Sequence, residues 1–129
     1  MENINIEATR FTPRISFDSK CNVFEIRGES YPENAADFYS PVFFWIENYI
    51  GQLEDHPFTI DIELFYFNSS SSKVLLDFFD LLEAAADNGK EIAVNWFYEK
   101  DDEDALEFGE EFQEDFDSLE FNLIEKPHN

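Results

Sequence analysis

Four consecutive serines, Ser69 to Ser72, are the residues of this sequence best suited to chemistry. They stand between Asn68 and Lys73, where a strand-like pattern ends and a helical pattern begins. Hydroxyl side chains are favoured at such a junction because they cap the free backbone N–H groups of a helix, but one hydroxyl is enough for one cap. The segment therefore has two interpretations, a capping loop or a functional hydroxyl cluster.

Phosphorylation is the chemistry that this position accommodates best. A phosphate brings about −1.5 to −2 charges, and the aligned dipoles and unpaired N–H groups of a helix start attract anions. Lys73 lies about one helical turn beyond Ser69 and could pair with a phosphate there. It is the only Lys or Arg between Arg27 and Lys90. We call Asn68, Ser69, Ser70, Ser71, Ser72 and Lys73 the switch segment and expect it to bind a partner.

An enzyme is a rival interpretation with little support in the residues. His56 and His128 are the only histidines, and the sequence contains no GxSxG, HExxH, P-loop or GxGxxG pattern. A serine nucleophile would lack a base. Carboxylate pairs such as Glu110-Glu111 lack the spacing of a calcium loop and are typical of a charged surface. We expect no catalysis, no metal and no cofactor; a hydrolase or metal-dependent enzyme that uses the carboxylates is the alternative.

Composition predicts one folded domain over residues 1–129. The chain is 43% hydrophobic and has 16 phenylalanines, which is enough apolar material for a single core. Its 30 acidic residues against 8 Lys and Arg give a net charge of −22. Such a charge repels nucleic acid and anionic membranes, so neither is an expected partner. An acidic mimic of nucleic acid that blocks a basic protein is a further alternative.

The cellular setting follows from weaker signals. Cys21 is the single cysteine, so no internal disulfide can form, and we expect it to serve in ordinary packing. The start of the chain has no basic segment followed by an apolar run, and no stretch approaches the roughly 20 apolar residues that cross a bilayer. We therefore expect a cytoplasmic protein.

The pattern of apolar residues predicts elements that would position the switch segment. Alternation predicts strands near residues 4–6, 15–17 and 23–26, followed by a helix from about residue 35. Pro41 leaves the start of that helix open, because proline is disfavoured inside a helix: the helix is either kinked there or begins near it. Residues 58–67 alternate over a length that suits a central strand.

After the serines the pattern becomes helical and then alternates again. The apolar stripe from Val74 to Ala85 predicts a helix that stops at Asn88-Gly89. A strand at 92–96, an acidic helix over 102–116 and a strand at 121–124 complete the order. Strands that alternate with helices favour an α/β fold, in which helices pack on a mixed sheet whose later strands are parallel.

Several motifs together resemble the SiaC-type regulatory phosphoproteins of bacteria, which are related in fold to SpoIIAA-like anti-anti-sigma factors and STAS domains. The resemblance covers nearly the whole chain in order and spacing, and the GxSYPEN stretch is its most specific part. The matching residues are Thr12-Pro13, Gly28-x-Ser30-Tyr31-Pro32-Glu33-Asn34, Asn68-Ser69-Ser70-Ser71-x-Lys73, Asp80-Leu81-Leu82-Glu83 and Glu110-Glu111-Phe112-x-Glu114-Asp115.

The resemblance implies a STAS-like domain that is switched by phosphorylation. Family members carry the phosphate on a threonine directly after the asparagine of an Asn-Thr-Ser-Ser motif, and the matching residue here is Ser69. A serine keeps the hydroxyl, and the four-serine run leaves Ser70 and Ser71 as alternative acceptors. The implied partners are a dedicated Ser/Thr kinase, a PP2C-type phosphatase and a signalling target such as a diguanylate cyclase, in c-di-GMP signalling. An anti-anti-sigma factor that captures an anti-sigma kinase is the alternative output.

Overall fold

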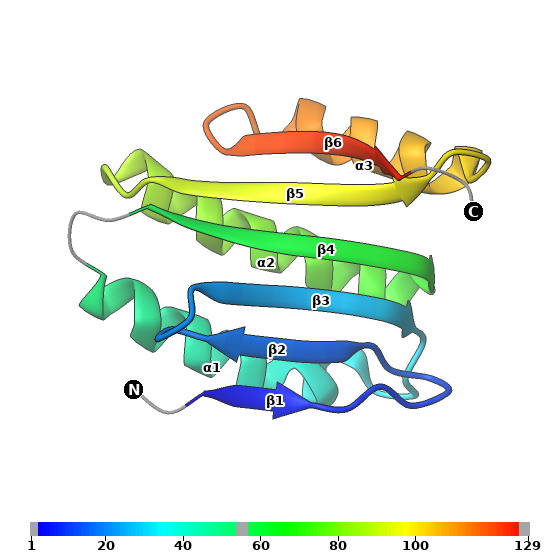
Figure 1. Cartoon of the computed structure of the whole chain (residues 1–129), viewed down its shortest axis with the longest axis horizontal. Coiled ribbons are helices and arrows are strands. Elements are labelled where there is room, and N and C mark those ends of the chain that lie inside the picture. The colour runs from blue at the N-terminus through cyan, green and yellow to red at the C-terminus, as the bar shows by residue number, and fades with distance from the viewer. Residues whose placement is uncertain (1–2, 54–56, 127–129) are drawn as a thin grey trace.

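The computed structural model describes residues 3–53 and 57–126, which form one mixed sheet and three helices. Figure 1 shows the elements in their chain order. The strands are β1 (Ile4–Ile6), β2 (Arg14–Asp18), β3 (Val23–Ser30), β4 (Phe58–Phe67), β5 (Ile92–Glu99) and β6 (Glu120–Lys126); the helices are α1 (Ala35–Gln52), α2 (Ser69–Asp87) and α3 (Glu103–Asp115).

The six strands lie in the sheet in the same order as in the sequence. The first three form an antiparallel meander, whereas β3, β4, β5 and β6 pair in parallel. Helical crossovers join the parallel strands, as parallel pairing requires. The predicted α/β class, the central place of residues 58–67 and the parallel later strands are confirmed.

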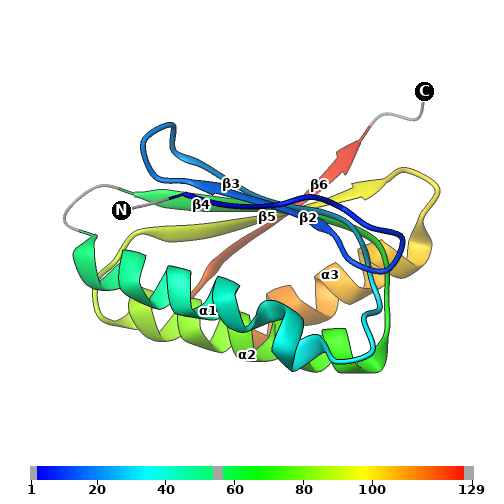
Figure 2. The same cartoon turned by 90° about the horizontal axis from the view of Figure 1, so that it is seen from below.

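All three helices cover one face of the sheet (Figure 2). The strand residues that face them are buried aromatic and aliphatic side chains, such as Phe24 and Ile26 in β3 and Ile60 and Ile62 in β4. The residues between them, such as Glu25 and Asp61, lie on the uncovered face. This alternation follows from the period of two along a strand. None of the helices in the described part of the chain is long and apolar enough to cross a membrane.

Local sequence signals explain where the helices begin and end. Helix α1 begins at Ala35, six residues before Pro41, with Asn34 as its cap, so the proline lies inside the helix and not at its start. Helix α2 ends at Asp87 with Asn88 as its C-cap, and Gly89 has a φ of 94°, the left-handed conformation expected of a glycine after a helix. The acidic helix α3 keeps its aromatic face toward the core through Phe112.

The uncovered face of the sheet carries a network of ion pairs. Glu63 in β4 is 4% exposed, and its carboxylate accepts hydrogen bonds from Arg27 at 2.8 Å and from Lys126 at 2.9 Å. Arg27 also lies 5.2 Å above the ring of Phe97. A buried carboxylate is tolerated when its charge is paired in this way. The network links β3, β4 and β6 across the face that no helix covers.

The pairing of β3 with β4 shifts by one residue close to the switch segment. Gly28 pairs with Leu64, but the next residue, Glu29, pairs with Tyr66, so Phe65 is an extra residue in β4. Phe65 and Tyr66 are 49% and 55% exposed. An extra residue in one strand redirects the side chains beyond it. The irregularity therefore leaves two adjacent aromatic side chains on the surface just before the serines.

Candidate functional site

The switch segment is the start of helix α2 at the carboxyl end of the central strand β4. Asn68 is the cap of the helix: its side-chain oxygen accepts a hydrogen bond of 2.9 Å from the backbone N–H of Ser71, and its carbonyl accepts one from Ser72. Of the two interpretations of the segment, the capping role thus belongs to Asn68 and not to a serine side chain. The serines are instead the first residues of the helix.

The serines differ sharply in exposure because they lie on successive sides of a helical turn. Ser69 and Ser70 are exposed, Ser72 is half-buried, and Ser71 is completely buried. The backbone N–H groups of Ser69 and Ser70 have no partner within the described ranges. Lys73 is exposed one turn further along the same helix. An exposed hydroxyl and free N–H groups therefore meet at Ser69, and Lys73 follows one helical turn later.

Ser71 is held in a chain of three buried hydroxyl groups. Its side-chain oxygen lies 2.8 Å from that of Ser30, which in turn lies 2.6 Å from the phenol oxygen of Tyr39. Burial raises the pKa of Tyr39 to about 12, although its hydrogen bond with Ser30 acts in the opposite direction. The end of β3, helix α1 and the first turn of α2 are thereby joined by buried polar contacts.

The GxSYPEN stretch reaches the switch segment through its backbone as well. The backbone N–H of Asn68 donates to the carbonyl of Ser30 at 3.1 Å. Gly28 begins the stretch with a φ of 132°, and a side chain at this position would lie 3.2 Å from Cα of Pro13. Glycine is needed where the backbone has this φ and a neighbouring chain approaches closely. The matching residues at 12–13, 28–34 and 68–73 thus form one continuous structure.

Tyr31 to Asn34 form the wall of a surface hollow and the start of a helix. The ring of Tyr31 makes edge contacts with the rings of Phe11 and Tyr66, at centroid distances of 5.3 Å and 5.4 Å. Asn34 caps α1 by accepting a hydrogen bond from the N–H of Asp37. Pro32 and Glu33 line the hollow between them. Sequence reasoning identified this stretch as a motif, but it missed Phe11 and Tyr66, which no pattern connects to it.

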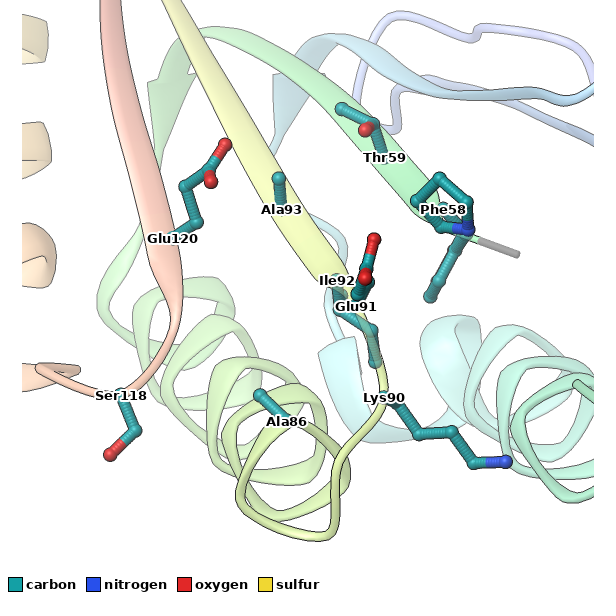
Figure 3. A pocket seen from close by; sticks show the side chains of 10 residues that line it. Phe58, Thr59, Ala86, Lys90, Glu91, Ile92, Ala93, Ser118 and Glu120 are labelled. Carbon is teal, nitrogen blue, oxygen red and sulfur yellow. The ribbon is translucent and has the colours of Figure 1, made fainter. Parts of the chain in front are cut away.

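A second hollow lies at the opposite end of the sheet, where β4, β5 and β6 begin. Its volume is about 330 Å³, and side chains that include Thr59, Lys90, Glu91 and Glu120 surround it (Figure 3). Lys90 extends toward α1 and donates to the carbonyl of Leu53. The hollow is far from the serines and contains no switch residue, so it does not belong to the candidate site.

The residues that an enzyme would need are not brought together in the described part of the chain. No group of three His, Cys, Asp or Glu side chains there could hold a metal ion. Cys21 is exposed, contrary to the expectation that it serves in packing. His56 and His128 lie outside the described residues. At the switch segment, the exposed groups that could do chemistry are the hydroxyls of Ser69 and Ser70.

Comparisons with known proteins identify the family of the chain. Residues 6–126 match the family model described as SiaC family regulatory phosphoprotein. The chain is 35% identical over 115 residues to an uncharacterised protein of Pseudomonas aeruginosa strain UCBPP-PA14, an overlap of 89% of this chain and 90% of that protein.

Two solved structures have the same fold. SiaC of Pseudomonas aeruginosa is similar with a TM-score of 0.85 and 32% identity, over 99% of this chain and 100% of that one. The second structure is that of the diguanylate cyclase SiaD of Pseudomonas aeruginosa in complex with its activator SiaC. Its similarity has a TM-score of 0.85 and 33% identity, over 97% of this chain and 99% of the matched chain. The family is one of regulatory phosphoproteins and not of enzymes. This chain belongs to the SiaC family of regulatory phosphoproteins.

Proposed function

We propose that this chain is a binding protein switched by phosphorylation of Ser69, which controls its association with a diguanylate cyclase. A dedicated Ser/Thr kinase adds the phosphate and a PP2C-type phosphatase removes it. The observation that carries the proposal is the position of Ser69, the first residue of α2, with an exposed hydroxyl beside free backbone N–H groups. The membership in a regulatory phosphoprotein family supports it.

The geometry disfavours Ser71 as the phosphate acceptor. Ser71 is completely buried against Ser30, so a kinase could not reach its hydroxyl without opening the first turn of α2. Ser70 is exposed and is the remaining alternative. A phosphate on Ser69 would accept hydrogen bonds from the N–H groups of the helix start and would have Lys73 within one turn.

The phosphate acts on the partner surface and leaves the fold unchanged. The helix start tolerates the added charge, so the domain keeps its structure. A partner that packs on the exposed Phe65 and Tyr66 beside Ser69 must then cover a dianion, which costs desolvation free energy. The unmodified protein therefore binds and activates the cyclase, and the phosphorylated protein is released.

Phosphopeptide mapping and binding measurements test this proposal together. We expect mass spectrometry of the protein from its native cells to find the phosphate on Ser69. Purified Ser69→Ala should bind the cyclase as the unmodified wild type does, and the wild type phosphorylated at Ser69 should bind at least about 10-fold more weakly.

Ser72→Ala is the matched control, since Ser72 is a half-buried neighbour in the same turn. It should be phosphorylated and released like the wild type. A phosphate that is found on Ser70 alone, or a phosphorylated protein that binds the cyclase unchanged, contradicts the assignment to Ser69.

A further inference from the structure

An apolar hollow lies directly beside the switch segment, on the side of the GxSYPEN stretch. Its volume is about 650 Å³, and its lining comes from the end of β1, the connection between β1 and β2, the connection between β3 and α1, and the first turns of α1. The lining residues are Ile6, Glu7, Thr9, Phe11, Thr12, Tyr31, Pro32, Glu33 and Phe38. Phe11 is 51% exposed, so much of this apolar wall faces water.

One wall of the hollow contacts the end of β4, close to the switch segment. Tyr31 forms one wall, and its ring contacts that of Tyr66 at 5.4 Å, only three residues before Ser69. Figure 2 shows the β1–β2 connection, the β3–α1 connection and the start of α2 at the same end of the sheet. A partner that covers Ser69 and Tyr66 can therefore reach the hollow without a change in the fold.

The charges around the hollow define the chemistry of what fits it. Glu7 and Glu33 are exposed in its rim, whereas Arg10, which is exposed in the same connection between β1 and β2, does not line the hollow. The chain as a whole has a net charge of −22. An apolar site inside an acidic rim favours a segment with an apolar side chain and neighbouring basic residues, because opposite charges attract and like charges exclude other segments.

We propose that this hollow receives an apolar side chain of the regulated partner, from a segment that carries Lys or Arg beside it. The proposal rests on the proposed function, because the partner is the protein that the Ser69 phosphate releases. It adds a second point of contact. The hollow contributes to the affinity for the partner, and the phosphorylation state of Ser69 controls whether the partner remains bound. Phe11 and Tyr31 provide the apolar walls, and Glu7 and Glu33 select the basic neighbours.

A photo-crosslinking experiment on the full chain tests the occupant. The probes are the diguanylate cyclases of the source organism, each purified and mixed with the unphosphorylated chain. The chain carries p-benzoylphenylalanine in place of Phe11, and a matched control carries it in place of Phe44, which is 73% exposed on α1 and does not line the hollow. The crosslinked peptides are identified by mass spectrometry.

The expected result is a crosslink from position 11 to an apolar residue of the cyclase with a Lys or Arg within two residues. The control position should give at most about a tenth of that yield. Phe11→Ala should weaken binding about 10-fold or more, whereas Phe44→Ala should change it less than about 2-fold. Glu7→Gln combined with Glu33→Gln should weaken binding and reduce its dependence on salt.

The binding measurements distinguish failure of the proposed function from failure of the occupant proposal. If the unmodified wild type binds none of the cyclases, the proposed function fails and the occupant proposal fails with it. If the wild type binds but Phe11→Ala binds equally well, only the occupant proposal is wrong. A crosslink to a second copy of this chain, to an acidic segment, or with equal yield from position 44 likewise overturns the occupant proposal.

Discussion

The side-chain oxygen of Ser30 lies 2.8 Å from that of Ser71, although the two residues are 41 positions apart in the sequence. Both hydroxyls are completely buried. The contact joins the GxSYPEN stretch to the first turn of α2, and the backbone bond from Asn68 to Ser30 runs beside it. The orientation of the serine cluster is therefore set by a residue of a different motif.

Removal of the Ser71 hydroxyl should loosen the start of α2. Ser71→Ala leaves Ser30 with Tyr39 as its only hydroxyl partner, and the loss of one buried hydrogen bond should lower the free energy of unfolding by about 1–2 kcal/mol. Urea denaturation measures the change. Ser70→Ala is the control, because Ser70 is exposed and its change should stay within about 0.5 kcal/mol. Equal effects of the two substitutions would show that the buried contact contributes nothing.

The buried phenol of Tyr39 should make stability depend on alkaline pH. Its pKa is raised from 10.0 to about 12 in the folded protein, so the folded state holds the proton more tightly than the unfolded state. The resulting stabilisation is complete below pH 10 and is lost as the pH rises toward 12. Two pKa units correspond to roughly 2–3 kcal/mol.

Comparison of the wild type with Tyr39→Phe isolates this contribution. The unfolding free energy of the wild type should fall more steeply above about pH 10 than that of the variant, because phenylalanine has no proton to lose. The raised pKa of Tyr49 is common to both proteins and cancels in the difference. Parallel pH profiles for the two proteins would mean that Tyr39 titrates normally.

Much of the fold could be predicted because it depends on local periodicity. The alternation over residues 58–67 predicted the central strand, and the Asn88-Gly89 pair predicted the end of α2. Each signal lies within a few residues of the feature that it specifies. Pro41 left the start of α1 undecided, and the structure places that start at Ala35, because the cap at Asn34 and the buried face that includes Tyr39 outweigh the cost of a proline inside the helix.

The details of the site depend on contacts between distant residues and could not be predicted in this way. The burial of Ser71 requires the hydroxyl of Ser30 at the end of another strand. The exposure of Phe65 and Tyr66 follows from a register shift in the sheet, which the sequence of β4 alone does not reveal. Periodicity identifies elements, but the side chains that two elements share appear only after they pack.

Gly109 should be required for the packing of α3 on the sheet. A Cβ atom there would lie 2.6 Å from Cδ1 of Trp96 and 2.8 Å from Cδ2 of Leu123, distances at which something must move. Trp96 is completely buried, and its indole N–H donates to the carbonyl of Ala105, so it cannot shift freely. Gly109→Ala should lower stability by about 1–3 kcal/mol, as overpacking does.

Gly51→Ala is the matched control for that substitution. Gly51 also lies in a helix, but a Cβ atom there meets nothing within 4 Å. Alanine has the higher helix propensity, so this variant should be neutral or more stable by up to about 1 kcal/mol. Thermal unfolding of both variants checks the contrast, and a destabilised Gly51→Ala with a neutral Gly109→Ala would refute the packing argument.

Loss of the Glu63 charge should destabilise the uncovered face of the sheet. Glu63→Gln keeps the shape of the side chain but removes the negative charge that Arg27 and Lys126 share at 2.8 Å and 2.9 Å. Both basic partners are partly exposed, at 31% and 40%, so water compensates part of the loss. We expect the free energy of unfolding to fall by about 1–3 kcal/mol, less than for a fully buried pair.

Glu125→Gln makes the same change at an exposed position of β6 and should have little effect. Urea denaturation of the two variants decides the point: similar stabilities would mean that the network on the uncovered face contributes no more than an ordinary surface charge.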